Sequence, residues 1–494
     1  MEAKNPRRWW ILIVLCLSTL VLVIDNMVLT VAVPPLAADL GATPQDIQWI
    51  LDSYILVFAG LLLTAGSLSD RFGRRKVMII GLALFGLSSL AATFAADPVQ
   101  LIVARTVMGI GGALIMPSTL SILITVFDDT ERRKAMAAWS AVAMVGLVGG
   151  PVLGGALIAW FWWGAVFLIN VPIAVIAIVA ALALMPESKG PKVKPDPLGA
   201  ILSVVGMTGL VWTIIEAPHG LNWTSLAAAV LGLVGFVVWE LRVKEPMVPL
   251  NLFRNRLFSG SSLSLTLVQI GNGGLLLVLT QYLQYVLDYT PTQAGLAFIP
   301  MAGASLLFNA LGATLGAKVG NRVMIVAGLL TIATGFGLMS TLDADTGFVF
   351  TAFALFVLGA GGGMAMPSAI AALMSTVPPA QAGVGSALND TIQQAGAALG
   401  VAVLGSVVSA GFTNAMPGSA PEAATRSIGE ALALGDGAIA QAARSAFTTA
   451  MSDSFLISAF AVVGAAVLAL FVMRQPKAAA TAEQDRQPAM AAHH

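Results

Sequence analysis

The stretch GIGGALIMPS at residues 109–118 returns as GAGGGMAMPS at residues 359–368, with six of ten positions unchanged at an offset of 250 residues. A second echo, KVMI at residues 76–79, returns as RVMI at residues 322–325. A third is a set of spaced glycines, in which Gly146, Gly150 and Gly155 return as Gly396, Gly400 and Gly405. Three echoes in the same order predict two related halves. Parallel repeats in an apolar chain are typical of transporters whose halves move around a central site.

The amino-acid composition indicates a membrane protein. Hydrophobic residues make up 57% and charged residues only 10% of the 494 residues, and the mean hydropathy is +0.88. This balance excludes an ordinary soluble domain. The formal net charge is zero, which gives no general attraction to nucleic acid, and the single Cys16 cannot form an intramolecular disulfide.

Apolar stretches repeatedly reach the roughly 20 residues that a helix needs to cross a bilayer. We count fourteen of them, and the abundant glycines suit close helix contacts in lipid. The predicted spans are 9–33, 47–66, 77–95, 99–121, 136–158, 164–185, 197–216, 224–241, 257–286, 291–317, 322–341, 348–373, 382–409 and 454–474.

The distribution of Lys and Arg predicts the topology, because short loops that carry these residues stay cytoplasmic. If the N-terminus is cytoplasmic, 22 of the 25 Lys and Arg residues lie on the cytoplasmic side. The exceptions are Arg105, which lies within a span, and Arg426 and Arg444, which lie in a long polar loop at about 411–453. Both termini are therefore predicted to be cytoplasmic, with Trp9 and Trp10 as an interfacial anchor of the first span.

Three acidic residues fall inside predicted spans and away from their ends, namely Asp25, Asp52 and Asp390. A charge there costs about 2.5–3.5 kcal/mol on insertion scales, so each of them needs a function or a partner. Because desolvation disfavours the charged form of a carboxyl group, each is a candidate proton carrier. The alternative is a carboxylate that caps a helix break or is paired permanently with a cation. Near Asp390, a polar helix face that we expect to line a cavity comprises Asn389, Gln393 and Gln394.

Arg105 is the one basic residue that lies inside a predicted span and away from its ends, and its counterpart in the second half is the apolar Leu355. It therefore needs a carboxylate or carbonyl partner. A pair with Asp25 or Asp52 could couple proton loss to a conformational change, since a nearby cation stabilises the charged carboxylate. A fixed structural pair is the alternative.

The segment GSLSDRFGRRK at residues 66–76 lies between the second and third predicted spans. Its closely spaced glycines and charges are Gly66, Asp70, Arg71, Gly73, Arg74 and Arg75. We expect a tight turn in which Asp70 caps the next helix or binds a partner across the turn. Topology alone explains the cations, but an acid placed directly before them favours a latch at the cytoplasmic gate.

The segment GLVGGPVLGG at residues 146–155 places a glycine stripe around a proline. The residues of interest are Gly146, Gly150, Pro151, Gly154 and Gly155. Small residues let a second helix approach closely, and proline removes a backbone hydrogen bond. We interpret the stripe as a conformational control element, with ordinary small-residue packing as the alternative.

At these residues the chain resembles the major facilitator superfamily, and within it the fourteen-span drug:proton antiporter branch. The segment 66–76 is similar to the loop signature G-x-L-x-D-R-x-G-R-[RK]-x, and Arg105 with Gly109 and Gly111 fits R-x-x-x-G-x-G. The segment 146–155 fits the antiporter pattern G-x(3)-G-P-x-x-G-G. Asp25 fits the first-helix pattern D-x-T-x-x-N-x-A-x-P only in part, because Met27 and Thr30 depart from it. WILDSYIL around Asp52 and FLINVP at residues 167–172 also look like that branch.

The resemblance implies an all-α major facilitator fold with 14 transmembrane helices. The implied parts are an N-terminal six-helix bundle at 9–185, two inserted transmembrane helices with their linkers at 186–256, a C-terminal six-helix bundle at 257–475 and a cytoplasmic tail at 476–494. It also implies that Asp25 and Asp390 bind protons or a cationic drug, that Arg105 takes part in proton coupling, and that Asp70 with the arginines of its loop stabilises the outward-facing state.

The function implied by the resemblance is proton-coupled multidrug efflux by alternating access, with lipophilic, cationic drugs or antibiotics as substrates. The protein would act as a monomer in the cell (inner) membrane, with protons as the coupling ion and no other cofactor or metal. The alternative is proton-coupled export of an endogenous metabolite, lipid or siderophore-like compound. An enzyme is disfavoured because His219 is the only histidine outside the tail. The sequence contains no G-x(4)-G-K-[ST] loop, so ATP is not the implied energy source.

Overall fold

In a computed structural model of the protein, the residues described are 6–127, 129–189, 196–244, 246, 248, 250–377 and 382–473. These residues form helices and loops, and no strand occurs among them. The first helices are α1 (Arg8–Leu40), α2 (Pro44–Phe72), α3 (Arg74–Thr93), α4 (Pro98–Val126), α5 (Asp129–Trp160), α6 (Ala165–Leu168) and α7 (Asn170–Leu184). The predicted tail 476–494 lies outside the described residues.

The middle of the chain forms α8 (Pro197–Glu216), the short η1 (Ala217–His219) and α9 (Trp223–Arg242). The remaining helices are η2 (Leu250–Arg254), α10 (Arg256–Gln281), η3 (Tyr282–Val286), α11 (Pro291–Ala297), α12 (Ile299–Val319), α13 (Asn321–Met339), α14 (Phe348–Met374), α15 (Ala382–Ala415), α16 (Glu422–Arg426), α17 (Ile428–Ala433) and α18 (Gly437–Val472).

Thirteen helices in the described part of the chain are long and apolar enough to cross a membrane. Each corresponds to one of the predicted spans. The fifth predicted span lies in α5, whose described apolar stretch is the shorter Gly149–Trp160. The all-α architecture is therefore confirmed, and the count of fourteen spans stays a prediction.

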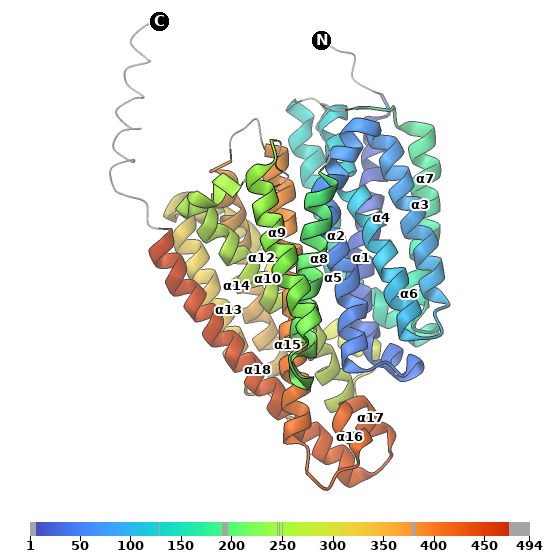
Figure 1. Ribbon diagram of the computed structural model, residues 1–494, viewed down its shortest axis with the longest axis vertical. Helices are drawn as coiled ribbons and strands as arrows, with labels where there is room; N and C mark the ends of the chain where they lie inside the picture. Colours follow the sequence, from blue (N-terminus) through green and yellow to red (C-terminus); the bar gives the residue numbers. More distant parts are fainter. Residues whose placement is uncertain are drawn as a thin grey trace, which may run out of the picture.

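The helices form two groups, and each group encloses a hydrophobic core (Figure 1). The first core is built from α1 to α7, and the second is built mainly from α10 to α18. The pair α8 and α9 lies between the groups, and α8 packs on both α2 and α15. A third, small cluster marks this contact, with Leu56 of α2 and Ala398 of α15 against Val211 of α8.

The repeated glycines make matching helix contacts in the two groups. A Cβ atom on Gly109 of α4 would lie 2.7 Å from the Tyr54 carbonyl oxygen of α2, and one on Gly359 of α14 would meet the Met301 carbonyl oxygen of α12 in the same way. Glycine lets the two backbones touch at each place. The sequence echo therefore records the same helix packing twice.

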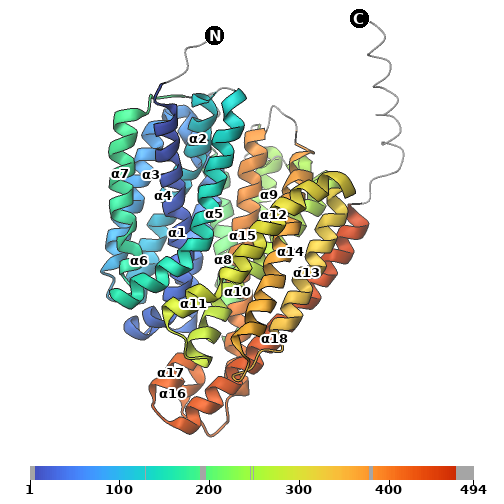
Figure 2. The same cartoon turned by 180° about the vertical axis from the view of Figure 1, so that it is seen from behind.

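Several helices extend beyond the predicted spans because polar residues start them outside the apolar stretch. Thr43 forms a capping box with Asp46 at the start of α2, and Asp436 caps α18 through the backbone N–H groups of residues 438 and 439. The expectation of one long polar loop at 411–453 is wrong. α15 continues to Ala415, α16 and α17 follow, and α18 begins at Gly437 (Figure 2).

Candidate functional site

A buried ion pair joins α1 and α4 inside the first group of helices. Asp25 and Arg105 are each only 1% exposed, and Arg105 Nη1 donates to Asp25 Oδ2 at 2.5 Å. The other carboxylate oxygen, Oδ1, accepts from Asn170 Nδ2 of α7 at 2.7 Å. Asn170 is also within 3.3 Å of Ser89 Oγ of α3. Four helices therefore meet at one charged centre.

The guanidinium group of Arg105 is also held by α2. Its Nε donates to the Ile50 carbonyl at 3.2 Å, and its Cζ lies 4.3 Å from the centre of the Tyr54 ring. Tyr54 stacks on Phe58 at 5.7 Å. The close approach of α4 to α2 at Gly109 makes this geometry possible. A buried charge is tolerated only when it is paired and hydrogen-bonded, and Arg105 has both kinds of contact.

In the structure Arg105 pairs with Asp25 and not with Asp52. Asp52 of α2 is fully buried, and neither of its carboxylate oxygens has a hydrogen-bond partner. The neighbouring turns of α2 place Gln48 beside Gly405 of α15 and Leu56 in the cluster with α8 and α15. Asp52 therefore lies on the helix face that packs between the two groups. A buried carboxyl group without a partner carries a desolvation cost that no hydrogen bond offsets.

Asp390 lies in α15 of the second group, and the structure does not join it to Asp25 or Arg105. Asn389 Nδ2 is 3.0 Å from Asp390 Oδ1, and no basic side chain of the described chain forms an ion pair with Asp390. Gln393 and Gln394 are half-buried on the next turn. The buried Asn389 Oδ1 has no hydrogen-bond partner. The polar face expected from the sequence therefore exists, and its role stays a prediction.

The segment 66–76 forms the expected tight turn, although most of the segment is helical. α2 continues to Phe72 and α3 begins at Arg74, so Gly73 alone forms the turn. Asp70 does not cap α3. It forms an ion pair with Arg74 at 2.7 Å, and Arg74 Nη1 also donates to the Ser121 carbonyl of α4 at 3.2 Å. Gly66 lies within α2, and Arg71 is placed over the neighbouring Phe72 ring.

Glu187, just after α7, is a partner of this turn that sequence reasoning missed. Its carboxylate accepts from the backbone N–H groups of Arg75 at 3.0 Å and Lys76 at 3.2 Å. A helix N-terminus favours a negative charge, which explains the contact. Gly73 has φ +118°, and a Cβ atom there would lie 2.7 Å from the Glu187 carboxyl carbon. The turn needs glycine for both reasons.

The glycine stripe of α5 packs on α1 close to Asp25. Cβ atoms added to Gly150 and Gly154 would lie 2.4 Å from Met27 and 2.9 Å from Val28. Gly146 contacts α1 about one turn earlier, at Val23. Small residues therefore bring the α5 backbone against the part of α1 that carries the buried carboxylate.

The end of the same stripe joins the two groups of helices. Thr292 Oγ1 of α11 donates to the Gly155 carbonyl at 2.9 Å, and a Cβ atom on Gly295 would lie close to the Pro151 carbonyl oxygen. Nearby, Gln284 Nε2 donates to the Val31 carbonyl of α1 at 2.9 Å. These contacts lie where α1 and α5 end, on the side opposite the start of α1 (Figure 2). We call this set of contacts the outer gate, where outer means the end of the molecule away from the start of α1.

The main residues that sequence reasoning missed at the charged centre are Asn170 and Tyr54. Asn170 belongs to the segment FLINVP and Tyr54 to WILDSYIL, both of which the sequence analysis describes. Neither segment indicates which residue its side chain contacts. An asparagine inside an apolar span was the available signal, because an amide in lipid needs a partner. Which carboxylate it contacts depends on helix packing.

Comparisons with known proteins agree with this architecture. The model of the Major Facilitator Superfamily matches residues 15–401 and 262–492. The multidrug efflux pump LfrA of Mycolicibacterium smegmatis is 36% identical over 486 residues, which cover 94% of this chain and 96% of that relative. The puromycin resistance protein pur8 of Streptomyces alboniger is 36% identical over 425 residues, with 84% of each chain covered.

A solved structure has the same fold. It is a bacterial homologue of the human lysosomal transporter Spinster, in an inward-facing and occupied conformation, with a TM-score of 0.72, 18% identity and coverage of 96% of this chain and 98% of that one. The sequence match extends over nearly the whole chain, and the helices repeat in two groups. This multi-pass membrane protein belongs to the major facilitator superfamily.

Proposed function

We propose that the protein exports lipophilic, cationic drugs or antibiotics in exchange for protons, by alternating access. The observation that carries this proposal is the buried centre of Asp25, Arg105 and Asn170. A carboxylate inside a span can bind a proton in one state and a cation in another, which is what an exchange of the two requires. The names of the relatives, a multidrug efflux pump and a puromycin resistance protein, support drug efflux. The protein is proposed to act as a transporter and not as an enzyme.

Proton binding at Asp25 would weaken its ion pair with Arg105. The guanidinium group would then keep only its contacts with the Ile50 carbonyl and the Tyr54 ring. This change would reach the outer gate through α1 and α5. Met27, two residues after Asp25, packs on Gly150, and about one turn further along α5 Gly155 contacts Thr292. A ligand shifts a conformational equilibrium when it binds one state more tightly, and the proton would be that ligand.

The proton gradient supplies enough free energy for this exchange. An inward proton gains about 2.3 kcal/mol per 100 mV of membrane potential. Each unit of pH gradient adds about 1.4 kcal/mol. A tenfold substrate gradient costs about 1.4 kcal/mol. In a one-to-one exchange, exporting a monovalent cation costs the potential energy that the proton gains, so each unit of pH gradient drives about a tenfold gradient of such a cation, and a neutral substrate would gain the potential energy as well.

The topology that we propose places both termini in the cytoplasm and the outer gate on the outside of the cell membrane. The Lys and Arg distribution supports it. The direction of the helices agrees with two termini on one side, because α1 and α18 run in opposite directions in Figure 1. We further propose that one copy of the chain suffices for transport, since both groups of helices and the charged centre belong to a single chain.

The experiment is substrate-driven pH change in sealed proteoliposomes, with a panel of lipophilic cations and neutral antibiotics. We expect proton movement when a cation is added, and its loss in Asp25→Asn. Asp345→Asn is the matched control, because Asp345 is an exposed acid in the loop before α14. Wild-type proton exchange in Asp25→Asn would contradict the role of Asp25. If proton exchange occurred only with an endogenous metabolite, lipid or siderophore-like compound, that compound and not a drug would be the substrate.

A further inference from the structure

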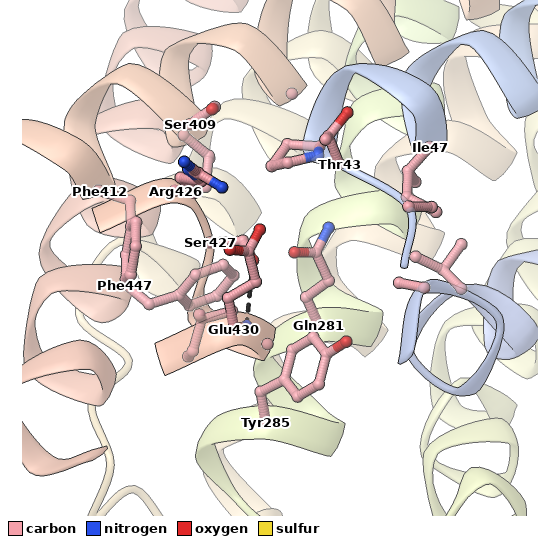
Figure 3. Close-up of a pocket in the computed structure, with 18 of the residues that line it drawn as sticks. Thr43, Ile47, Gln281, Tyr285, Ser409, Phe412, Arg426, Ser427, Glu430 and Phe447 are labelled. Carbon is pink, nitrogen blue, oxygen red and sulfur yellow. Dashed lines mark hydrogen bonds between the residues drawn. The ribbon is translucent and has the colours of Figure 1, made fainter. Parts of the chain in front are cut away.

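A second site is present at the outer end of the molecule. A cavity of about 420 Å³ lies where α1 ends and α2 begins, and its walls come from both groups of helices (Figure 3). α16 and α17 form one side of it, opposite Thr43 and Ile47. Asp25, Arg105 and Asp390 do not line it. The cavity is therefore distinct from the charged centre.

The wall formed by α16 and α17 is held in place by hydrogen bonds. Thr413 Oγ1 of α15 donates to the Thr425 carbonyl of α16 at 3.0 Å. Ser427 Oγ accepts from the backbone N–H of Glu430 at 3.1 Å and thereby starts α17. These contacts position the Glu430 side chain, which Figure 3 shows pointing into the same space as that of Gln281.

The charge that faces the cavity without a partner is negative. Arg426 also lines the cavity, but it forms an ion pair with Glu422 at 3.2 Å, and its side chain is 58% exposed. Glu430 is half-buried and makes no ion pair with a described basic residue. A carboxylate in a mostly apolar, concave site attracts a cation more strongly than one in open water, because the local dielectric is lower.

Aromatic rings stand around this carboxylate. Tyr285, Phe412 and Phe447 line the cavity together with aliphatic side chains such as Ile47. Aromatic faces attract organic cations and also bury apolar surface. The volume falls within the range of about 300–1,000 Å³ that is usual for drug-sized ligands. Carboxylate, rings and size together specify one kind of ligand.

We propose that this cavity is an outer binding site for a monovalent organic cation with an apolar body, held by the Glu430 carboxylate and the rings of Tyr285, Phe412 and Phe447. The proposal deepens the proposed function and rests on it, because the ligand would be an exported cation after it has passed the outer gate. The site would hold the cation beside the closed gate before it diffuses away.

The experiment measures protection of a cysteine in the cavity by ethidium, a monovalent apolar cation. Ser409→Cys is made together with Cys16→Ser, which removes the only native thiol, and intact cells are labelled with a membrane-impermeant maleimide. We expect ethidium to slow the labelling. Glu430→Gln should raise the half-protecting concentration about tenfold or more, which corresponds to 1.4 kcal/mol. Asp345→Asn is the control, an exposed acid of the loop before α14 that does not line the cavity, and should leave it unchanged.

Equal protection in wild type and Glu430→Gln would overturn the proposal, because closure caused by binding at the charged centre would give that result. If Ser409→Cys is not labelled, Ala433→Cys is used, since Ala433 is an exposed residue of the lining. Failure of both to react would show that the cavity is closed to the outside and would also overturn it.

Ethidium–proton exchange in proteoliposomes is measured separately, so that the two proposals can fail independently. Protection that depends on Glu430 without exchange would leave the outer site standing and contradict export of this cation. Exchange without protection that depends on Glu430 would contradict the outer site alone.

Discussion

At the scale of single residues, the charged centre is built so that every atom of one carboxylate is used. Asp25 Oδ2 contacts Arg105 and Oδ1 contacts Asn170, so neither oxygen is left without a donor. Asp52, about two turns into the next helix, has no donor at all. The contrast separates the two acids, because the cation and the amide offset the desolvation cost of the Asp25 carboxylate, whereas no hydrogen bond offsets that cost at Asp52.

Arg105→Met should destabilise the protein by about 3–5 kcal/mol, because it leaves Asp25 as a buried charge without its cation. The double variant Arg105→Met with Asp25→Asn should recover most of this loss, since no buried charge remains. Thermal unfolding in detergent measures both. Arg426→Met, at an exposed ion pair, serves as the control and should change stability by less than about 1 kcal/mol. A single variant as stable as wild type would show that the pair carries no stability.

At the scale of helices, glycines decide which backbones touch. Gly73 and Gly320 each precede a helix, α3 and α13, and both have positive φ values, +118° and +93°. Their surroundings differ, because Glu187 stands against Gly73 while nothing lies within 4 Å of a Cβ atom on Gly320. The two halves thus share the backbone turn, and only the first half adds a side-chain latch to it.

Gly320→Ala should cost about 1–3 kcal/mol through backbone strain alone. Gly73→Ala should cost more, because Glu187 must also move away from the backbone N–H groups of Arg75 and Lys76. In a background of Glu187→Ala, the extra cost of Gly73→Ala should vanish. Unfolding measurements on the four variants form the test, and an equal cost at both glycines in the native background would refute the latch.

Gly155→Ala should open the outer gate, since the new Cβ atom would lie 2.5 Å from the Pro291 carbonyl oxygen and the Thr292 Cα. Backbone atoms cannot rotate away, so α5 and α11 must separate. Gly149→Ala on the same helix has nothing within 4 Å and is the control. We expect faster labelling of a cysteine at Thr292 from the outside in Gly155→Ala only. Equal labelling rates in the two variants would contradict the role of α5 in closing the outer gate.

At the scale of the whole molecule, two groups of helices contact each other through the outer gate and through the packing of α2 on α15, and α8 contacts both groups. α1 and η3 are joined there by Val31 and Gln284, and α5 and α11 by Gly155 and Thr292. Alternating access requires these contacts to break, because the central site must open to the outside for release. The contacts within each group need not change.

A cysteine pair at Val31 and Gln284, joined by a short cleavable cross-linker in a Cys16→Ser background, should stop transport, and reduction should restore it. The control is a pair at Ser340 and Ser452, which lie within the second group and share a hydrogen bond of 2.5 Å. Transport assays before and after reduction measure both. Undiminished transport with the gate pair cross-linked would contradict rocking of the two groups.

The sequence by itself determined the class of the fold and its internal symmetry. Hydropathy and the repeated glycines act through local and nearest-neighbour contacts, so they can be read along the chain. It also identified Asp25 and Arg105, because charges in apolar spans stand out. Only the tertiary structure decided that they are partners, that Asn170 completes the centre, and that Asp52 is left alone. These contacts depend on how helices that are far apart in the chain pack against one another, and a sequence pattern does not give the distances between such helices. The outer cavity with Glu430 arises for the same reason. Its walls come from α1, α2, α10, η3, α15, α16, α17 and α18, and some of these residues lie in a predicted loop that is in fact helical.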